Sequence, residues 1–468
     1  MAIGKFLLKG EKLYGDIYTN HQPVTYIMSA VIQKAIHPNS IPLIVKRFRE
    51  SVILWSFIFS FILMLRFGPW VLLFIIPFEM TKNIMLGQVF LAESFVVYPA
   101  VYLAGLVLLP HQNLGEKDLF FAGVLLAFIA FSLLPLLPFV AFVILALTLK
   151  LHRGKRAKMM LCLSGFLIVL VIVSYFSSLG NYFRDTFIAN YFYYLPSVGI
   201  VGETANPLAG ILAPVHYLPA FFDLSLFSRL LALNSLVYLF CILILFASGT
   251  VLLPFSMIFL AGFANVRSVD LVKEFFNGFH VLPWYGLMLF LISFAVVKIK
   301  DIKINRPVRS IFFLLVMFVF FLNSYLAKDY FLSRVNREGD AYINYSKQFD
   351  DAEAVRIMNS GNDTLFAAYD GSLIYWYSGV RHASPAVFYY PWMRDLPYLK
   401  SQVDEMFTKS PPAFLYLSYV QKDLWPYLDI YERLRKDEHE TNLYVLKEKV
   451  AALTKEQYKG LDYYRFSF

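Results

Sequence analysis

The chain has 468 residues, of which 58% are hydrophobic, 18% are aromatic and 16% are charged, and its formal net charge is +9. Soluble globular domains carry about 25% charged residues, so this composition excludes an ordinary soluble protein and is typical of helices packed in lipid. The basic residues form short runs between apolar stretches, without a basic face or a nucleic-acid-binding signature. The sequence therefore predicts a membrane protein that binds no nucleic acid.

The N-terminal part begins with a polar segment. Residues 10–23, which read GEKLYGDIYTNHQP, bring acidic, imidazole and amide side chains together and are called here the N-terminal motif. No apolar core of a cleavable signal peptide precedes it. Residues 22–36 are moderately apolar but too short to cross a bilayer, so we expect an interfacial helix there. We assign residues 1–49 to a first outer loop with interfacial helices.

Apolar runs then follow in series, and a transmembrane helix needs about 17–25 such residues. Two of the runs, 136–151 and 250–264, are short for that purpose. The pattern predicts an α-helical polytopic membrane body over residues 50–327, with about ten transmembrane helices. The expected helices lie at 50–66, 69–86, 92–110, 119–134, 136–151, 159–178, 229–248, 250–264, 282–298 and 308–327.

Two basic loops, at residues 150–158 and 298–309, set the expected orientation. Both are cytoplasmic by the positive-inside rule. Counting helices from these loops places the N-terminal motif, Glu93 and the C-terminal region outside, together with residues 179–228, an aromatic-rich stretch of interfacial helices and turns. The cluster Lys46, Arg47 and Arg49 then lies on the outer side, which runs against the rule.

From about residue 328 the composition becomes that of a soluble domain. Strand patterns alternate with helical patterns, which predicts a small extracytoplasmic α/β domain over residues 328–468 with a mostly parallel sheet. The expected strands are 364–369, 386–390, 413–417 and 443–446, and the expected helices are 347–360, 396–409 and 422–435.

The cysteines give no sign of a disulfide or a metal site. Cys162 and Cys241 both lie inside apolar runs, where a small buried side chain is the simpler interpretation. No Cys/His spacing typical of a metal site is present. We predict no metal-binding residues and no cofactor, with a divalent metal left open.

Three segments carry a resemblance to a known family. The N-terminal motif has the pattern GxxLYxDxxxNHxP. It resembles the first outer loop of the C-type superfamily of integral-membrane glycosyltransferases, nearest to the bacterial relatives of dolichyl-phosphate-mannose protein mannosyltransferases and to the aminoarabinose transferase of lipid A. Residues 87–93 (GQVFLAE) look like the family's second acidic outer loop, and residues 265–267 with 280–283 look like its basic outer loop. With the multihelix body and the outer α/β domain, the resemblance covers nearly the whole chain.

One departure concerns the start of the chain. In the family, the first loop opens with an acidic motif that holds the principal base, and a helix precedes it. Both would lie upstream of Met1. We expect an N-terminally truncated sequence, and a degenerate family member is the alternative.

The resemblance implies a glycosyltransferase that moves a hexose or pentose from a polyprenyl-phosphate carrier to a lipid, glycan or protein acceptor. The reaction would take place on the extracytoplasmic face of a bacterial inner membrane. In this interpretation the catalytic acids are Asp16 and Glu93. The lipid-phosphate-binding candidates are His21, Arg267, Lys82 and His280, and the substrate-binding candidates are Tyr14, Asn20 and Asp185.

Each candidate also has a plainer explanation. Asp16 can be a solvated loop acid, Glu93 a helix N-terminal carboxylate favoured by the macrodipole, and Arg267 an interfacial anchor. Two other functions remain as alternatives. One is a lipid-sugar transporter or flippase, for which broken helices and charges near the midplane are typical. The other is a non-catalytic membrane assembly protein.

Overall fold

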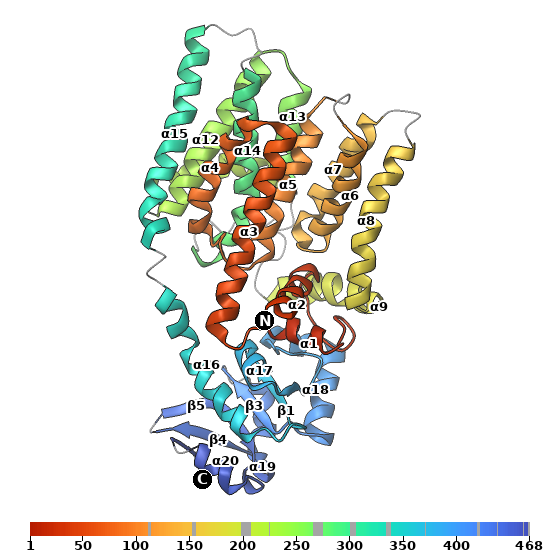
Figure 1. Cartoon of the computed structure of the whole chain (residues 1–468), viewed down its shortest axis with the longest axis vertical. Coiled ribbons are helices and arrows are strands. Elements are labelled where there is room, and N and C mark those ends of the chain that lie inside the picture. The colour runs from red at the N-terminus through yellow and green to blue at the C-terminus, as the bar shows by residue number, and fades with distance from the viewer. Residues whose placement is uncertain are drawn as a thin grey trace. The chain divides into compact units, whose positions relative to one another are not determined.

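The computed structural model describes residues 1–110, 114–151, 156–197, 207–223, 225–264, 275–299, 306–333, 338–369, 371–418, 422–437, 439–461 and 463–466. The described chain is mostly helical and carries a small C-terminal sheet (Figure 1). It divides into two compact units. The first unit comprises Met1–Lys46, Ser174–Ile200 and Arg337–Phe468, and the second comprises Arg47–Val173 and Val201–Asn336.

Each run that we expected to span the membrane forms a helix. The helices of this body are α3 (Ile41–Phe67), α4 (Leu72–Thr81), α5 (Ala92–Leu108), α6 (Glu116–Ala130), α7 (Leu137–Lys150), α8 (Arg156–Phe176), α11 (Pro207–His216), α12 (Leu226–Ala247), α13 (Leu252–Phe263), α14 (Leu282–Ile299) and α15 (Arg306–Ser333). Short 3-10 segments join them, namely η1 (Pro69–Val71), η2 (Lys82–Met85), η4 (Leu134–Leu136), η6 (Leu218–Phe222) and η8 (Phe275–Val281).

Five helical stretches in the described part of the chain are long and apolar enough to cross a membrane. They are Ile41–Phe67, Ala157–Phe176, Leu226–Ala247, Gly278–Ile299 and Arg309–Lys328. Other expected spans form shorter apolar helices, among them Ala92–Leu108, Leu134–Lys150 and Leu252–Phe263. Length and composition thus identify five candidate spans, fewer than the number expected from the sequence.

The candidate spans differ in how much of their surface is covered. The apolar window of α14 is 89% buried, and Trp284 and Tyr285 are fully buried within it. The corresponding windows of α8 and α15 are only 11% and 33% buried. A helix that is apolar on all sides and covered on all sides is a core helix. The bare apolar surfaces of α8 and α15 are suited to contact with lipid.

Two glycines allow α6 and α8 to approach each other. A Cβ atom on Gly123 would lie 1.8 Å from the carbonyl oxygen of Cys162, and one on Gly165 would lie 2.2 Å from that of Phe120. Small residues permit such backbone contact between membrane helices.

The first unit joins the two ends of the chain. Its N-terminal helices α1 (Ala2–Leu8) and α2 (Val24–Ile36) pack against each other, and α1 also packs against α17 (Ser372–Ser378). Lys5 Nζ donates to the carbonyl oxygen of Trp376 at 2.5 Å, and Trp376 Nε1 donates to Gln33 Oε1 at 2.8 Å. These bonds tie the start of the chain to the C-terminal α/β fold.

The C-terminal sheet is mixed, which corrects the expectation of a mostly parallel sheet. Its strand order is β2-β1-β3-β5-β4-β6. β1 pairs in parallel with β2 and β3, whereas the β3–β5, β4–β5 and β4–β6 pairs are antiparallel. The strands are β1 (Thr364–Ala368), β2 (Arg381–His382), β3 (Phe414–Leu417), β4 (Tyr431–Lys436), β5 (His439–Leu446) and β6 (Tyr464–Phe466). The helices around it are α16 (Glu338–Met358), α17, α18 (Pro397–Lys409), α19 (Lys447–Ala451) and α20 (Lys455–Gly460), with η9 (Pro391–Asp395) and η10 (Lys422–Ile430).

Two expected elements of this domain were wrong. The strand expected at 386–390 makes a single isolated bridge, between Ala368 and Tyr389, and the edge strand is β2 instead. The helix expected at 422–435 is a 3-10 segment that contains Pro426 and is followed by β4. Proline interrupts α-helical hydrogen bonding, and pairing with β5 then fixes the following residues as a strand.

Candidate active site

Glu93 lies in the first turn of α5 and is 5% exposed. A tight loop leads to it. Leu86 has a φ of 56°, and the N–H of Gly87 donates to the carbonyl oxygen of Lys82 at 2.8 Å. A Cβ atom on Gly87 would lie 2.8 Å from Lys82 Cβ, so glycine lets the loop close on η2. The carboxylate is thereby held at the helix N-terminus, where a negative charge is favoured.

The Glu93 carboxylate contacts the imidazole of His280, a residue of η8. Glu93 Oε1 lies 2.9 Å from His280 Nδ1, and the His280 side chain is 22% exposed. An ionised carboxylate only accepts hydrogen bonds, so Nδ1 carries the proton. Nε2 is then an acceptor whenever the ring is neutral. Within the described part of the chain, Nε2 makes no hydrogen bond. Two residues that the sequence singled out separately, 187 positions apart, therefore form one pair.

Lys82 lies in η2, which packs against η8. Its Nζ is 2.6 Å from Glu79 Oε2 and donates to Ser56 Oγ at 2.9 Å. The hydroxyl of Tyr98 donates to Glu79 Oε1 at 2.6 Å. Glu79 thus compensates the charge of Lys82, so a bound phosphate would have to share this ammonium. Our sequence reasoning missed Glu79, although its i,i+3 spacing from Lys82 on a helix was a usable signal.

The first unit contains most of the other candidates. Tyr14 is buried, with a φ of 63°, and its hydroxyl donates to the carbonyl oxygen of His21 at 2.7 Å. Its ring meets that of Tyr182 edge to face, with centroids 5.2 Å apart. Asn181 Nδ2 also donates to the Tyr14 carbonyl at 2.8 Å. These bonds hold the turn of the N-terminal motif against α9 (Leu179–Phe183).

Asp185 belongs to η5 (Arg184–Tyr194), a π-helical segment, and Asn20 bonds to Asn190 of the same segment. The amides of Asn20 and Asn190 bond reciprocally: Asn20 Nδ2 donates to Asn190 Oδ1 at 2.9 Å, and Asn190 Nδ2 to the Asn20 carbonyl at 2.7 Å. Asp185 is 1% exposed and accepts from Arg184 Nε at 2.7 Å and from the Tyr398 hydroxyl at 2.9 Å. π-helical segments are rare in proteins, and those that occur are often found at functional sites.

Burial is the main cause of the raised pKa values of Asp185, Tyr182 and Tyr14. It raises the pKa of the Asp185 carboxyl, while the hydrogen bonds from Arg184 and Tyr398 act in the opposite direction. Burial likewise raises the pKa of Tyr182 to about 12 and that of Tyr14 well above its usual value. Both phenols are therefore neutral hydrogen-bond donors at pH 7.

The remaining predicted residues are Asp16, His21 and Arg267. Asp16 is exposed, and its Oδ2 accepts from the N–H of Lys12 at 2.9 Å, which closes the turn of the N-terminal motif. His21 is also exposed. Arg267 lies outside the described residues. The candidates thus form two separate groups, with Glu93, His280 and Lys82 in the second unit and Tyr14, Asp16, Asn20, His21 and Asp185 in the first.

A second carboxylate–imidazole pair escaped our sequence reasoning altogether. His382 Nε2 lies 2.6 Å from Glu11 Oε2, and His382 Nδ1 lies 2.8 Å from the carbonyl oxygen of Ser384. Nothing local in the sequence links positions 11 and 382.

Among the described residues, no group of three or more His, Cys, Asp or Glu side chains is placed to hold a metal ion. A carboxylate that orients an imidazole is an arrangement that enzymes use for general base catalysis. No protein-family model matches the chain, and a search of curated proteins finds no match either.

Proposed function

We propose that this chain is a membrane glycosyltransferase that transfers a sugar from a polyprenyl-phosphate carrier to a hydroxyl acceptor. The observation that carries the proposal is the part-buried Glu93–His280 pair, packed beside the Lys82 segment in the helical unit. A buried carboxylate among apolar helices is costly and is commonly retained for function. The family resemblance of residues 87–93 and 280–283 points to the same two segments.

In the proposed reaction, His280 Nε2 takes the proton of the acceptor hydroxyl. The acceptor oxygen attacks the anomeric carbon, and the bond from that carbon to the phosphate oxygen breaks. The polyprenyl phosphate leaves with the bonding electrons, and Glu93 stabilises the imidazolium that forms. We assign the leaving phosphate to Lys82, because η2, which carries Lys82, packs against η8, which carries His280. Asp16, His21 and Arg267 stay predicted contributors from the resemblance.

We further propose that α4, α5, α6, α7 and α13 also cross the bilayer, which makes ten crossings together with the five candidate spans. The 17 residues of α5 extend about 26 Å, close to the hydrocarbon thickness of a bilayer. Ten crossings together with the basic loops would put Glu93 and the C-terminal α/β fold on the extracytoplasmic face of an inner membrane.

The test follows the leaving group, because the acceptor is unknown. The full chain is reconstituted in nanodiscs with a panel of polyprenyl-phosphate hexoses and pentoses, and released polyprenyl phosphate is measured. Water takes the place of the acceptor hydroxyl in this assay, and we expect release with at least one donor. Glu93→Gln, which keeps the hydrogen bond to Nδ1 but removes the charge, should lower that rate about a hundredfold or more. Donor binding should remain.

Two outcomes would contradict the proposal. One is a wild-type rate in Glu93→Gln. The other is movement of the lipid-linked sugar across the bilayer without release of polyprenyl phosphate, which would support the transporter alternative.

A further inference from the structure

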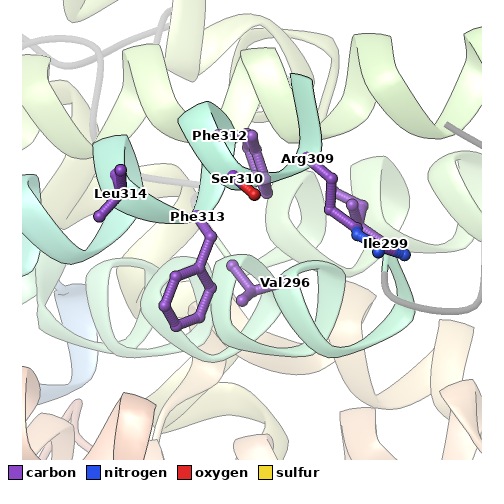
Figure 2. Close-up of a pocket in the computed structure, with 7 residues that line it drawn as sticks. All are labelled: Val296, Ile299, Arg309, Ser310, Phe312, Phe313 and Leu314. Atoms are coloured by element: carbon purple, nitrogen blue, oxygen red, sulfur yellow. The ribbon is translucent and has the colours of Figure 1, made fainter. Parts of the chain in front are cut away.

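A cavity of about 390 Å³ lies between α14 and α15, at the end of α14 and the start of α15 (Figure 2). That volume falls within the range of small-molecule sites. Its walls are mainly apolar, and two polar side chains, Arg309 and Ser310, contribute to its lining. The cavity belongs wholly to the second unit.

The cavity has an apolar part and a charged end. On α14, Val296 and Ile299 are buried at 4% and 1% exposure, and Phe312 of α15 is also buried. Figure 2 shows Phe313 beside Val296 between the two helices, with the Arg309 side chain reaching toward Ile299. An apolar wall therefore leads to a guanidinium group.

Arg309 is the first residue of the candidate span Arg309–Lys328. A cation at the end of a span lies at the level of the lipid headgroups. Beyond it, α15 presents bare apolar side chains, with Ile311 67%, Leu314 66% and Phe318 60% exposed. The apolar surface that continues from the cavity is thus one that acyl chains would cover.

We propose that this cavity binds one anionic phospholipid. The phosphate lies at Arg309, whose planar guanidinium suits bidentate contact with phosphate oxygens, and the Ser310 hydroxyl can donate to it. One acyl chain lies along Val296, Ile299 and Phe313. Basic pockets between transmembrane helices are a known setting for anionic headgroups.

This site is separate from the proposed transfer site. His280 precedes the start of α14 by two positions, whereas the cavity lies at the end of this 18-residue helix. The helix extends about 27 Å. Loss of lipid binding and loss of sugar transfer can therefore be measured independently.

The experiment uses the full chain in detergent micelles that contain equal amounts of phosphatidylglycerol and phosphatidylcholine. Bound lipids are counted by native mass spectrometry. We expect a preference for phosphatidylglycerol that falls about fivefold in Arg309→Gln, since a basic residue near a membrane surface contributes about that factor. Arg309→Lys should retain most of the preference.

Lys328→Gln is the matched control, because Lys328 lies near the other end of α15, with its Nζ 3.9 Å from the ring centroid of Tyr325. It should leave the preference for phosphatidylglycerol unchanged.

Ser310→Phe, which fills the cavity from an exposed position, should reduce bound phosphatidylglycerol without altering the charge. Inorganic phosphate should not displace the lipid, because the acyl chain supplies much of the affinity. An unchanged preference in both Arg309→Gln and Ser310→Phe, an equal loss in Lys328→Gln, or displacement by phosphate would overturn the proposal.

Discussion

The two units each contain a carboxylate–imidazole pair, and the pairs differ in what the second ring nitrogen does. In the first unit, His382 uses both nitrogens, one toward Glu11 and one toward the carbonyl oxygen of Ser384. In the second unit, His280 bonds to Glu93 through Nδ1, and Nε2 makes no hydrogen bond within the described part of the chain.

This difference distinguishes a pair whose ring nitrogens are both hydrogen-bonded from a pair that we propose as a general base. A carbonyl oxygen only accepts, so His382 Nδ1 must donate to it, and the remaining proton of the pair is held between Nε2 and Glu11. Phe6 packs edge-on against the same ring, with centroids 4.9 Å apart. His382 therefore joins the N-terminal segment to the C-terminal fold. His280 Nε2 makes no hydrogen bond among the described residues, as the proposed general base requires.

The largest expected effect tests this assignment directly. His280→Gln should lower the rate of polyprenyl phosphate release by two to four orders of magnitude, because it removes the proposed general base. The measurement is the rate under saturating donor in nanodiscs, with donor binding measured in parallel.

His382→Gln is the matched variant in the other pair. It should change the release rate less than about threefold and lower the unfolding free energy of the first unit by about 1–3 kcal/mol, since a part-buried polar group loses its partner. If the two substitutions reduced the rate equally, the distinction between the pairs would be lost.

The helices and the central strands could be predicted because their signals are local. An apolar run specifies a membrane helix by its own composition, and the buried segments β1 and β3 stood out as short apolar runs. Residues 386–390 looked equally apolar but make only one bridge, between Tyr389 and Ala368. Whether an apolar run becomes a strand depends on a neighbour that lies elsewhere in the chain.

The pairs themselves could be predicted only in part. Glu93 and His280 were each recognised as candidates from their surroundings, but their contact spans 187 positions and follows from how η8 packs at the start of α5. Glu11, His382 and the Asp185–Tyr398 bond left no local signal. The N-terminal motif was expected in an outer loop, and the same limit explains why the burial of its Tyr14 and Tyr18 in the first unit was not predicted.

The next largest expected effect is a pH dependence of the stability of the first unit, which comes from Asp351. Burial raises the pKa of Asp351 from 3.8 to about 7, and Asp351 Oδ1 has no hydrogen-bond partner among the described residues. Because the pKa of Asp351 is higher in the folded state than in the unfolded state, its contribution to the unfolding free energy is fully present below about pH 4. That contribution is lost as the pH rises to about 7. The loss amounts to roughly 4 kcal/mol at most.

Asp351→Asn should remove most of this pH dependence and should stabilise the first unit at pH 8. The measurement is thermal unfolding of the full chain in detergent at pH 4.5 and pH 8, followed by near-ultraviolet circular dichroism. Asp350→Asn is the control, since Asp350 is half-exposed and pairs with Lys436 at 2.7 Å, a contact worth about 1 kcal/mol or less. A steep loss of stability that persists in Asp351→Asn would assign the titration to another group.

The smallest effect concerns Tyr14, the buried tyrosine of the N-terminal motif. Tyr14→Phe removes one hydrogen bond, from its hydroxyl to the carbonyl oxygen of His21, and keeps the ring contact with Tyr182. If Tyr14 is structural, like the Glu11–His382 pair, the unfolding free energy of the first unit should fall by about 0.5–1.5 kcal/mol, while the KM for the lipid-linked donor stays unchanged.

The family resemblance instead implies that Tyr14 binds the substrate. In that case the KM should rise about tenfold, because a hydrogen bond to the substrate worth about 1.4 kcal/mol is lost. Tyr182→Phe, which removes the 2.5 Å bond to Gln22 Oε1 on the same surface, provides the reference for a purely structural loss. A KM that rises in Tyr14→Phe but not in Tyr182→Phe would place the N-terminal motif in the substrate site and break the division between a structural first unit and a reactive second one.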